Sequence, residues 1–391
     1  MKVLLYILAF LFCFRFMGII EIPPKIILCL ILFLSIINFK RGLEFNKYIY
    51  WLFFFLLLNF FSCWYFNDQE IFDTFIASSS FLNLLLFWFF YGWKLDIVQW
   101  EKYIWWICLC FGICFIIQYL AFPTIIFGGQ IRTESVEQRI AIYGQGLASF
   151  SVIYGMNKYL ISRNIKYVII IFTGLFAVFG CGYRTMLLAL IVSILILLYR
   201  LKISLKSIIP FICIILFLFL FVNSVDLVQE QLTNMINRQE QLEGGGFEND
   251  IRYINLIYRY TSYFESPVEM ILGSGMPFEG TKYYIDNYNL EYIIGYYFSD
   301  WGLIGLSWMI GIPAVTVMIV YSIQIFKTKV PKEYLYIGIY FFNILISSIT
   351  THEFYIFHNY VVQAILFCLF TKVLEQYHLK LGKVNVYNVH K

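Results

Sequence analysis

The sequence predicts an all-α membrane protein whose chain crosses the bilayer about twelve times. Of its 391 residues, 61% are hydrophobic and only 13% are charged, whereas charged residues make up about 25% of a soluble domain. The apolar residues form long unbroken runs, and a helix needs about 20 mostly apolar residues to cross the hydrocarbon. A transmembrane barrel would show short alternating segments instead. We therefore expect a single helical domain over residues 1–391.

The predicted crossings are joined by short connections except at two places. They lie near residues 3–20, 25–39, 48–66, 71–91, 103–122, 140–160, 165–180, 184–199, 207–223, 302–326, 333–350 and 354–371. The first run is long and lacks a small-residue cleavage site, so we interpret it as a retained helix and not as a signal peptide. Nine Cys residues lie within or at the ends of these runs, which favours packing roles over disulfides.

The positive charges predict the orientation of the chain. Nineteen of the 28 Lys and Arg residues, sixteen of them Lys, fall in the connections and chain ends of one side. Cytoplasmic loops carry such an excess, so we expect both termini in the cytoplasm. The opposite side carries Lys25, Lys282, Arg15, Arg132, Arg139, Arg184, Arg238, Arg252 and Arg259. The cations are thus explained by topology, which excludes a nucleic-acid patch, and the outer arginines become the leading functional candidates.

A large outer loop is expected at residues 223–301, between the ninth and tenth helices. Its first part, Asp226 to Leu242, has the spacing of an amphipathic surface helix. Three glycines then interrupt the pattern, and Asp250 to Phe264 resumes a helical period. A shorter outer connection runs from Pro123 to about Arg139. The chain has no evident internal repeat, which disfavours a transporter built from inverted repeats.

Two pairs of outer arginines are spaced by seven residues. They are Arg132 with Arg139 and Arg252 with Arg259. In a helix, seven residues make almost two turns, so each pair would project from one face. Because the planar guanidinium binds phosphate oxygens in bidentate fashion, several converging arginines can form a pyrophosphate site. The alternative is that these arginines are surface charges paired with nearby carboxylates.

Arg184 stands at the outer start of the eighth predicted crossing, within Tyr183-Arg184-Thr185. A guanidinium at the edge of the hydrocarbon is costly unless a counter-ion or a water-filled cavity receives it. This makes Arg184 the arginine that ordinary surface exposure explains least.

Four segments together resemble the O-antigen polymerase and O-antigen ligase group of bacterial polysaccharide enzymes. They are RIAIYGQG from Arg139, Tyr183-Arg184-Thr185, Arg252 to Gly275 (RYINLIYRYTSYFESPVEMILGSG) and Gly302-Leu303-Ile304-Gly305. The similarity covers about residues 125–325. It implies transfer of a lipid-linked glycan at the outer face of the bacterial inner membrane. It also implies that Arg139, Arg184, Arg252 and Arg259 bind undecaprenyl pyrophosphate, with Arg132 as a weaker candidate.

The absence of histidine from the outer loop favours a polymerase over a ligase. Ligases of this group carry a His about a dozen residues before the Gly-Leu-Ile-Gly turn, where this chain reads Glu291 to Gly295. We expect a lipopolysaccharide-type polymerase that joins undecaprenyl-pyrophosphate-linked repeat units in the lipid bilayer, with a chain-length regulator and a flippase as further partners. An O-antigen ligase and a lipid-linked oligosaccharide flippase remain the alternatives.

Carboxylates near the outer face are candidates for the general base that accepts the proton of the acceptor hydroxyl. Glu291 ranks first because it directly precedes a crossing, and Asp286, Asp250 and Glu353 follow. A solvated residue at the interface is the alternative for Glu291. The sequence contains no closely spaced acidic or Cys/His set, so we expect neither a metal nor a cofactor.

Two further groups of outer residues call for an explanation. His352, Glu353 and His358 open the last crossing and, with Asn359 and Gln363, suggest a polar stripe facing the interior. Hydrogen bonding between helices would explain that stripe equally well. Tyr288, Tyr292 and Tyr296 recur every four residues. They would suit either sugar stacking or a belt at the membrane interface.

Overall fold

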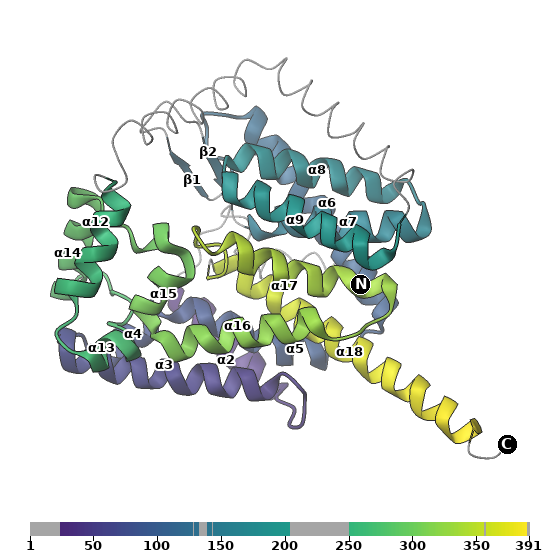
Figure 1. The fold of residues 1–391 in the computed structure, drawn as a ribbon, viewed down its shortest axis with the longest axis horizontal. Helices are drawn as coiled ribbons and strands as arrows, with labels where there is room; N and C mark the ends of the chain where they lie inside the picture. The colour runs from purple at the N-terminus through teal and green to yellow at the C-terminus, as the bar shows by residue number, and fades with distance from the viewer. Residues whose placement is uncertain are drawn as a thin grey trace.

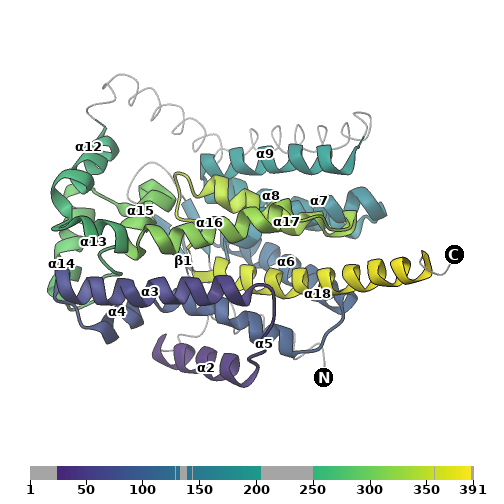
Figure 2. The ribbon, with the colours of Figure 1, turned by 60° about the horizontal axis from the view of Figure 1, so that its bottom comes forward.

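The computed structural model describes residues 24–127, 129–132, 139–142, 144–203, 250–355 and 357–388. These residues form an elongated bundle of helices, with a group of short helices at one end and the C-terminus at the other (Figures 1 and 2). In chain order, the elements are α2 (Pro24–Ile37), α3 (Asn46–Asn67), α4 (Ile71–Ala77), η2 (Ser79–Leu85), α5 (Leu86–Gly92), α6 (Ile97–Leu120), β1 (Gly129–Arg132), β2 (Arg139–Ile142), α7 (Gly146–Ser162), α8 (Lys166–Cys181), α9 (Arg184–Leu201), α12 (Ile251–Tyr258), η5 (Arg259–Tyr263), α13 (Pro267–Leu272), α14 (Lys282–Tyr288), η6 (Asn289–Ile294), η7 (Phe298–Trp301), α15 (Gly302–Ile310), α16 (Ile312–Lys327), η8 (Lys332–Tyr334), α17 (Leu335–Ser347) and α18 (Phe357–Asn388).

Several of these helices have the length and composition of membrane spans. Among the described residues, α3, α6 and α9 each meet that criterion alone, and α4 joined to η2 and α5 makes a fourth span if the bent pair is counted. Shorter apolar helices include α8 and α16. The helical class is confirmed. The predicted crossings at 3–20 and 207–223 and the predicted surface helix from Asp226 to Leu242 lie outside the described residues.

Two predicted crossings are broken helices instead of continuous ones. The 71–91 segment bends by 65° between Ala77 and Ser79. There the Asn83 side chain donates a hydrogen bond to the Ser80 carbonyl at 2.8 Å, and such local bonds compete with regular α-helix. The 302–326 segment breaks at Gly311, which has a φ of +91°. Pro313 follows in the first turn of α16 and lacks the N–H that would continue α15.

A polar side chain of α3 satisfies the carbonyls near the second break. Asn59 Nδ2 donates to the Leu272 and Met309 carbonyls, both at 2.8 Å. The backbone N–H groups of Ser274 and Gly275 donate to the carbonyls of Trp308 and Met309, each at 2.8 Å. The break therefore docks the end of α13 against α3 and α15, because a buried carbonyl without a partner is costly.

The short outer connection contains a β-hairpin, which the all-α prediction did not include. Strands β1 and β2 pair antiparallel, with Arg132 directly opposite Arg139. The helical interpretation of this arginine pair is therefore wrong. Ile140 and Ile142 are buried at a spacing of two, which is the period of a strand. The predicted 140–160 crossing accordingly begins later, with α7 at Gly146.

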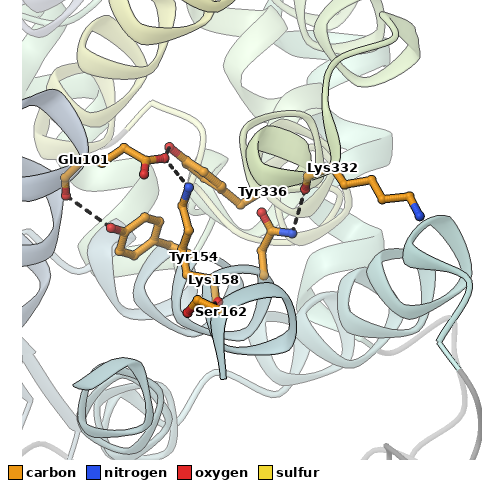
Figure 3. A network of polar contacts seen from close by, with 7 residues as sticks. Glu101, Tyr154, Lys158, Ser162, Lys332 and Tyr336 are labelled. Carbon is orange, nitrogen blue, oxygen red and sulfur yellow. Dashed lines mark hydrogen bonds and ion pairs between the residues drawn. The ribbon is translucent and has the colours of Figure 1, made fainter. Parts of the chain in front are cut away.

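Connections that the charge pattern placed on one side do meet at one end of the bundle, which we call the lysine end. Lys158 near the end of α7 pairs with Glu101 near the start of α6, and Tyr336 at the start of α17 donates to Glu101 at 3.2 Å (Figure 3). Asn157 Nδ2 donates to the Lys332 carbonyl at 3.1 Å. This sharing of one end by three lysine-bearing connections agrees with the predicted relative topology.

The described part of the large loop, 250–301, is helical and is anchored to the bundle. The prediction of a helix from Asp250 to Phe264 is confirmed, since α12 continues into the π-helical segment η5. Gln69, after α3, accepts from the Phe278 N–H at 2.8 Å and donates to the Met276 carbonyl at 2.9 Å. These bonds hold the loop at the end opposite the lysine end, which we call the site end.

Candidate active site at the site end

An exposed ion pair marks the start of α12. Arg252 Nε lies 3.5 Å from Asp300 Oδ2, with the two side chains 48% and 36% exposed. Asp250 caps the helix by accepting from the Arg252 N–H at 2.8 Å, and Trp301 Nε1 donates to the Arg252 carbonyl at 3.2 Å. The backbone around Arg252 is thus fixed from two sides while its guanidinium remains open to a ligand.

Arg259, seven residues and almost two turns further on, is entirely buried. Its guanidinium lies 3.9 Å from the centre of the Tyr263 ring and 5.6 Å from that of Trp308. Nη2 donates to the Tyr296 carbonyl at 3.4 Å, while Nε and Nη1 find no hydrogen-bond partner among the described residues. A buried cation with two open donors is costly, and η5, on which it stands, is a π-helical segment of the kind often found at functional sites.

Glu291 stands on the second π-helical segment, η6. Burial raises the pKa of its carboxyl, and the negative charge of Asp300 acts in the same direction. The Phe298 N–H and the positive charge of Arg259 oppose that shift. A carboxylate with a raised pKa accepts a proton more readily near neutral pH, as a general base requires. Asp286, which ranked second among the four predicted carboxylates, is exposed on α14. Its side chain makes no hydrogen bond or ion pair with the described residues.

The connection between α17 and α18, residues 348–355, packs against this cluster. The Tyr355 ring stacks on Phe298 at 5.9 Å. Burial raises the pKa of its hydroxyl, and the negative charges of Glu291 and Asp300 raise it further. This hydroxyl has no hydrogen-bond partner within the described residues. No sequence signal singled out Tyr355, because a tyrosine in this chain is most often a packing or interface residue.

The same connection holds the turn that leads from β2 into α7. Glu353 is buried and accepts from Gln145 Nε2 at 2.9 Å and from Asn359 Nδ2 at 3.2 Å. Burial raises its pKa to about 7, although these two hydrogen bonds lower it. A Cβ at Gly146 would overlap the Asn359 side-chain oxygen, so only glycine fits there. The end of RIAIYGQG is thereby locked onto Glu353.

Arg184 and the Gly-Leu-Ile-Gly turn are joined to this connection too. Arg184 is exposed at the first position of α9, and the neighbouring Thr185 hydroxyl lies 2.8 Å from that of Thr350. The Leu303 N–H donates to the Ser348 carbonyl at 2.8 Å. Three of the four segments singled out in the sequence thus contact residues 348–355, and the fourth is linked to them through Asp300, which pairs with Arg252.

The remaining predicted residues lie around this centre. Arg132 and Arg139 stand on the hairpin, whose second strand leads to Gln145. The His352 ring lies 5.8 Å from that of Tyr355. The predicted polar stripe faces the interior, since His358 and Gln363 are buried on α18 and Gln363 accepts from Tyr321 at 2.6 Å.

Two predicted arginines, Arg15 and Arg238, fall outside the described residues. Within the part of the chain that the structure describes, no group of three His, Cys, Asp or Glu residues is arranged to hold a metal ion.

A comparison with models of protein families gives a match. The family model described as "Putative O-antigen polymerase" matches residues 19–243. A search of curated proteins found no match. The matched range includes the hairpin, the start of α7 and Arg184, and it ends before α12, so Arg252, Arg259 and Glu291 lie beyond it.

Proposed function

We propose that this chain, which belongs to the O-antigen polymerase family, joins undecaprenyl-pyrophosphate-linked repeat units into a polysaccharide at the periplasmic face of a bacterial inner membrane. One observation supports this most. Residues 348–355 bond to the segments that follow Arg139 and Arg184, and they stack on Phe298, two residues before the Asp300 that pairs with Arg252. Several arginines at one end of a membrane bundle suit a ligand with two adjacent phosphates.

In the proposed reaction, the donor is a growing glycan on undecaprenyl pyrophosphate. The acceptor is a hydroxyl of the terminal sugar on a newly flipped repeat unit. A bond forms between that hydroxyl oxygen and the anomeric carbon of the donor, and the bond from the anomeric carbon to the pyrophosphate oxygen breaks. The released undecaprenyl pyrophosphate carries the electron pair away as an anion. Its stabilisation is the main requirement of the site.

The cations divide into two layers. Arg184 and Arg252 are exposed and would contact the pyrophosphate oxygens directly, with Arg139 on the hairpin as a third ligand. Arg259 is buried, almost two turns along the helix from Arg252, and would act through its field. Since arginines can supply the positive charge that the leaving group needs, the proposal calls for no metal or cofactor.

Glu291 is the proposed general base. The charges of Arg259 and Asp300 both act on the pKa of its carboxyl, which supports a role close to Arg259. It would accept the proton of the acceptor hydroxyl as the glycosidic bond forms. Asp286 is the weaker candidate because no described contact joins it to the arginines.

The proposed orientation places the lysine end and both termini in the cytoplasm. The site end then faces the compartment into which a flippase delivers the lipid-linked repeat, and a chain-length regulator would act on the product there.

The test uses two variants, Arg184→Lys and Arg252→Ala, in cells whose own copy of the gene is deleted. Both variants should shorten or abolish the polymer at matched protein levels. Arg184→Lys keeps the charge but loses the bidentate fork, and Arg252→Ala loses both. Lys25→Ala, which removes an exposed cation of α2 on the predicted outer side, is the control and should leave the polymer intact.

The polymer is measured on a gel of surface glycan, and two results on this gel would contradict the proposal. Unchanged polymer length and yield in both variants would remove the arginines from the reaction. Loss of all surface glycan on deletion, instead of accumulation of single capped repeats, would indicate a ligase.

A further inference from the structure

A row of tyrosine rings lies on the outer segment formed by α14 and η6. We call Tyr284, Tyr288, Tyr292 and Tyr297 the tyrosine ladder. Successive rings contact one another, with centroids 6.1 Å apart for the first pair, 4.6 Å for the second and 5.6 Å for the third. Tyr288 and Tyr292, the stacked pair, are 45% and 61% exposed. The ladder is therefore a continuous aromatic surface with its middle open.

The ladder is held from behind by buried polar contacts. Tyr283 donates to the Gly275 carbonyl at 3.1 Å, and Asn287 Nδ2 donates to the Tyr283 carbonyl at 3.0 Å. The Tyr263 hydroxyl bonds to both the Tyr283 hydroxyl and Asn287 Oδ1, each at 3.1 Å. Because α14 is fixed on its inner face, a ligand on the rings would meet a preorganised surface.

One end of the ladder adjoins the proposed pyrophosphate site. The Tyr297 carbonyl accepts from Asn255 Nδ2 at 3.1 Å, and Asn255 lies on α12 almost one turn after Arg252. Asp300, three residues after Tyr297, pairs with Arg252. From there the ladder runs along α14, at the outer edge of the group of short helices (Figure 1).

The choice of aromatic residue points to the ligand. All six aromatic residues from Tyr283 to Tyr297 are tyrosines, although Phe outnumbers Tyr by 42 to 31 in the chain. Tyrosine combines an apolar ring with a polar hydroxyl. Sugars present the matching pair of features, C–H groups on the faces of the ring and hydroxyls at its edge. Exposed Lys282, Asp286 and Asn289 add further hydrogen-bonding groups on the same segment.

We propose that the tyrosine ladder binds the glycan chain of the substrate, several sugars away from the reacting end. The inference rests on the proposed function and names the part of the substrate that this surface takes. Between additions, the ladder retains the growing glycan next to Arg252, so that the next repeat meets a donor that is already bound. The ladder therefore sets polymer length more than it sets the rate of a single addition.

The first experiment compares the double variant Tyr288→Ala/Tyr292→Ala with Tyr288→Phe/Tyr292→Phe in the full-length protein. The binding probe is polysaccharide released from the producing cells by mild acid and separated by size. The alanine pair should weaken binding of long fragments about tenfold or more, because two stacking surfaces are lost, and should leave binding of single repeats unchanged. The phenylalanine pair keeps both rings and should stay within about threefold.

In cells at matched protein levels, the alanine pair should still polymerise but give shorter chains. Unchanged polymer length together with unchanged binding of long fragments would overturn the inference. A complete loss of polymer in the alanine pair, with normal protein level, would overturn it also, since it would make the tyrosines part of the reaction.

The second experiment separates the glycan from the bilayer as the ligand. A photo-crosslinking benzoylphenylalanine in place of Tyr292 should yield a product that reacts with antiserum against the cell's own polysaccharide. Crosslinks to phospholipid alone would identify the ladder as an interface belt and refute the inference. This result is independent of the Arg184 and Arg252 variants. Failure of the ladder can therefore be told apart from failure of the polymerase assignment.

Discussion

Gly146→Ala is the substitution that most directly perturbs the connection between α17 and α18. The added methyl group would overlap the Asn359 side-chain oxygen. Asn359 must then move, and its amide gives up the hydrogen bonds that it donates to the Glu353 carbonyl and carboxylate. Overpacking of a tight contact costs about 1–3 kcal/mol, and a lost hydrogen bond to a charged group costs about 1.5–3 kcal/mol.

If only about 1.4–2.8 kcal/mol of this cost falls on the geometry of the site, polymer formation slows about tenfold to a hundredfold. The assay is the polymer yield and length on a gel of surface glycan at matched protein levels. Gly155→Ala is the matched control, since it inserts a methyl group on the same helix against the Ile171 side chain and the Tyr167 carbonyl, away from Glu353. Equal loss of polymer in the two variants would refute the reasoning, because it would reduce both effects to packing of α7.

Three other predictions concern buried charge. Lys158→Met leaves Glu101 without its cation, so it should lower the thermal midpoint of the purified protein markedly. The double variant Lys158→Met/Glu101→Gln should recover much of that loss. Equal thermal midpoints in the single and the double variant would contradict this prediction. Because burial raises the pKa of Glu353 to about 7, the folded protein holds a proton that the unfolded chain releases near pH 4.5, and its stability should fall as pH rises between those values. Glu353→Gln should make the thermal midpoint less dependent on pH in this range. An unchanged pH dependence would contradict the assignment of this effect to Glu353. The polymerisation rate should fall as pH drops through the raised pKa of Glu291, and Glu291→Gln should be slow at every pH, so a variant that keeps the wild-type profile would exclude Glu291 as the base.

The sequence predicted that the lysine-bearing connections share one side, and three of them do meet at the lysine end. Lysines mark the cytoplasmic connections of membrane proteins by their charge alone, and the contact of Lys158 with Glu101 agrees with the assignment of those connections to one side. The helix from Asp250 to Phe264 was predictable for a similar reason, because its period and its Asp250 cap are local properties of the chain.

The hairpin and the helix breaks depend on contacts that a local pattern does not contain. Arg132 and Arg139 have a spacing that fits a helix, but they lie on β1 and β2, which pair with each other as antiparallel strands. Gly311 and Pro313 together signal a break, yet the break is stabilised by Asn59, which is about 250 residues away in the sequence. Such long-range hydrogen bonds override local preference.

The role of residues 348–355 could not be predicted from the sequence either. Ser348, Thr350, Glu353 and Tyr355 each contact a different segment, and none of them forms a motif. The sequence offered Glu353 only as a lower-ranked candidate for the general base and as a polar residue at the start of an apolar run. The structure shows it instead as the acceptor for Gln145 and Asn359.

The most direct test of the account is polymerisation by the purified, full-length protein supplied only with its lipid-linked repeat unit. The account predicts that the wild-type protein forms a series of lipid-linked polymers of increasing length and releases one undecaprenyl pyrophosphate for each added repeat. Arg252→Ala should form little or no polymer. Polymer formation by Arg252→Ala at the wild-type rate, or no polymer from folded wild-type protein, would contradict the central claim.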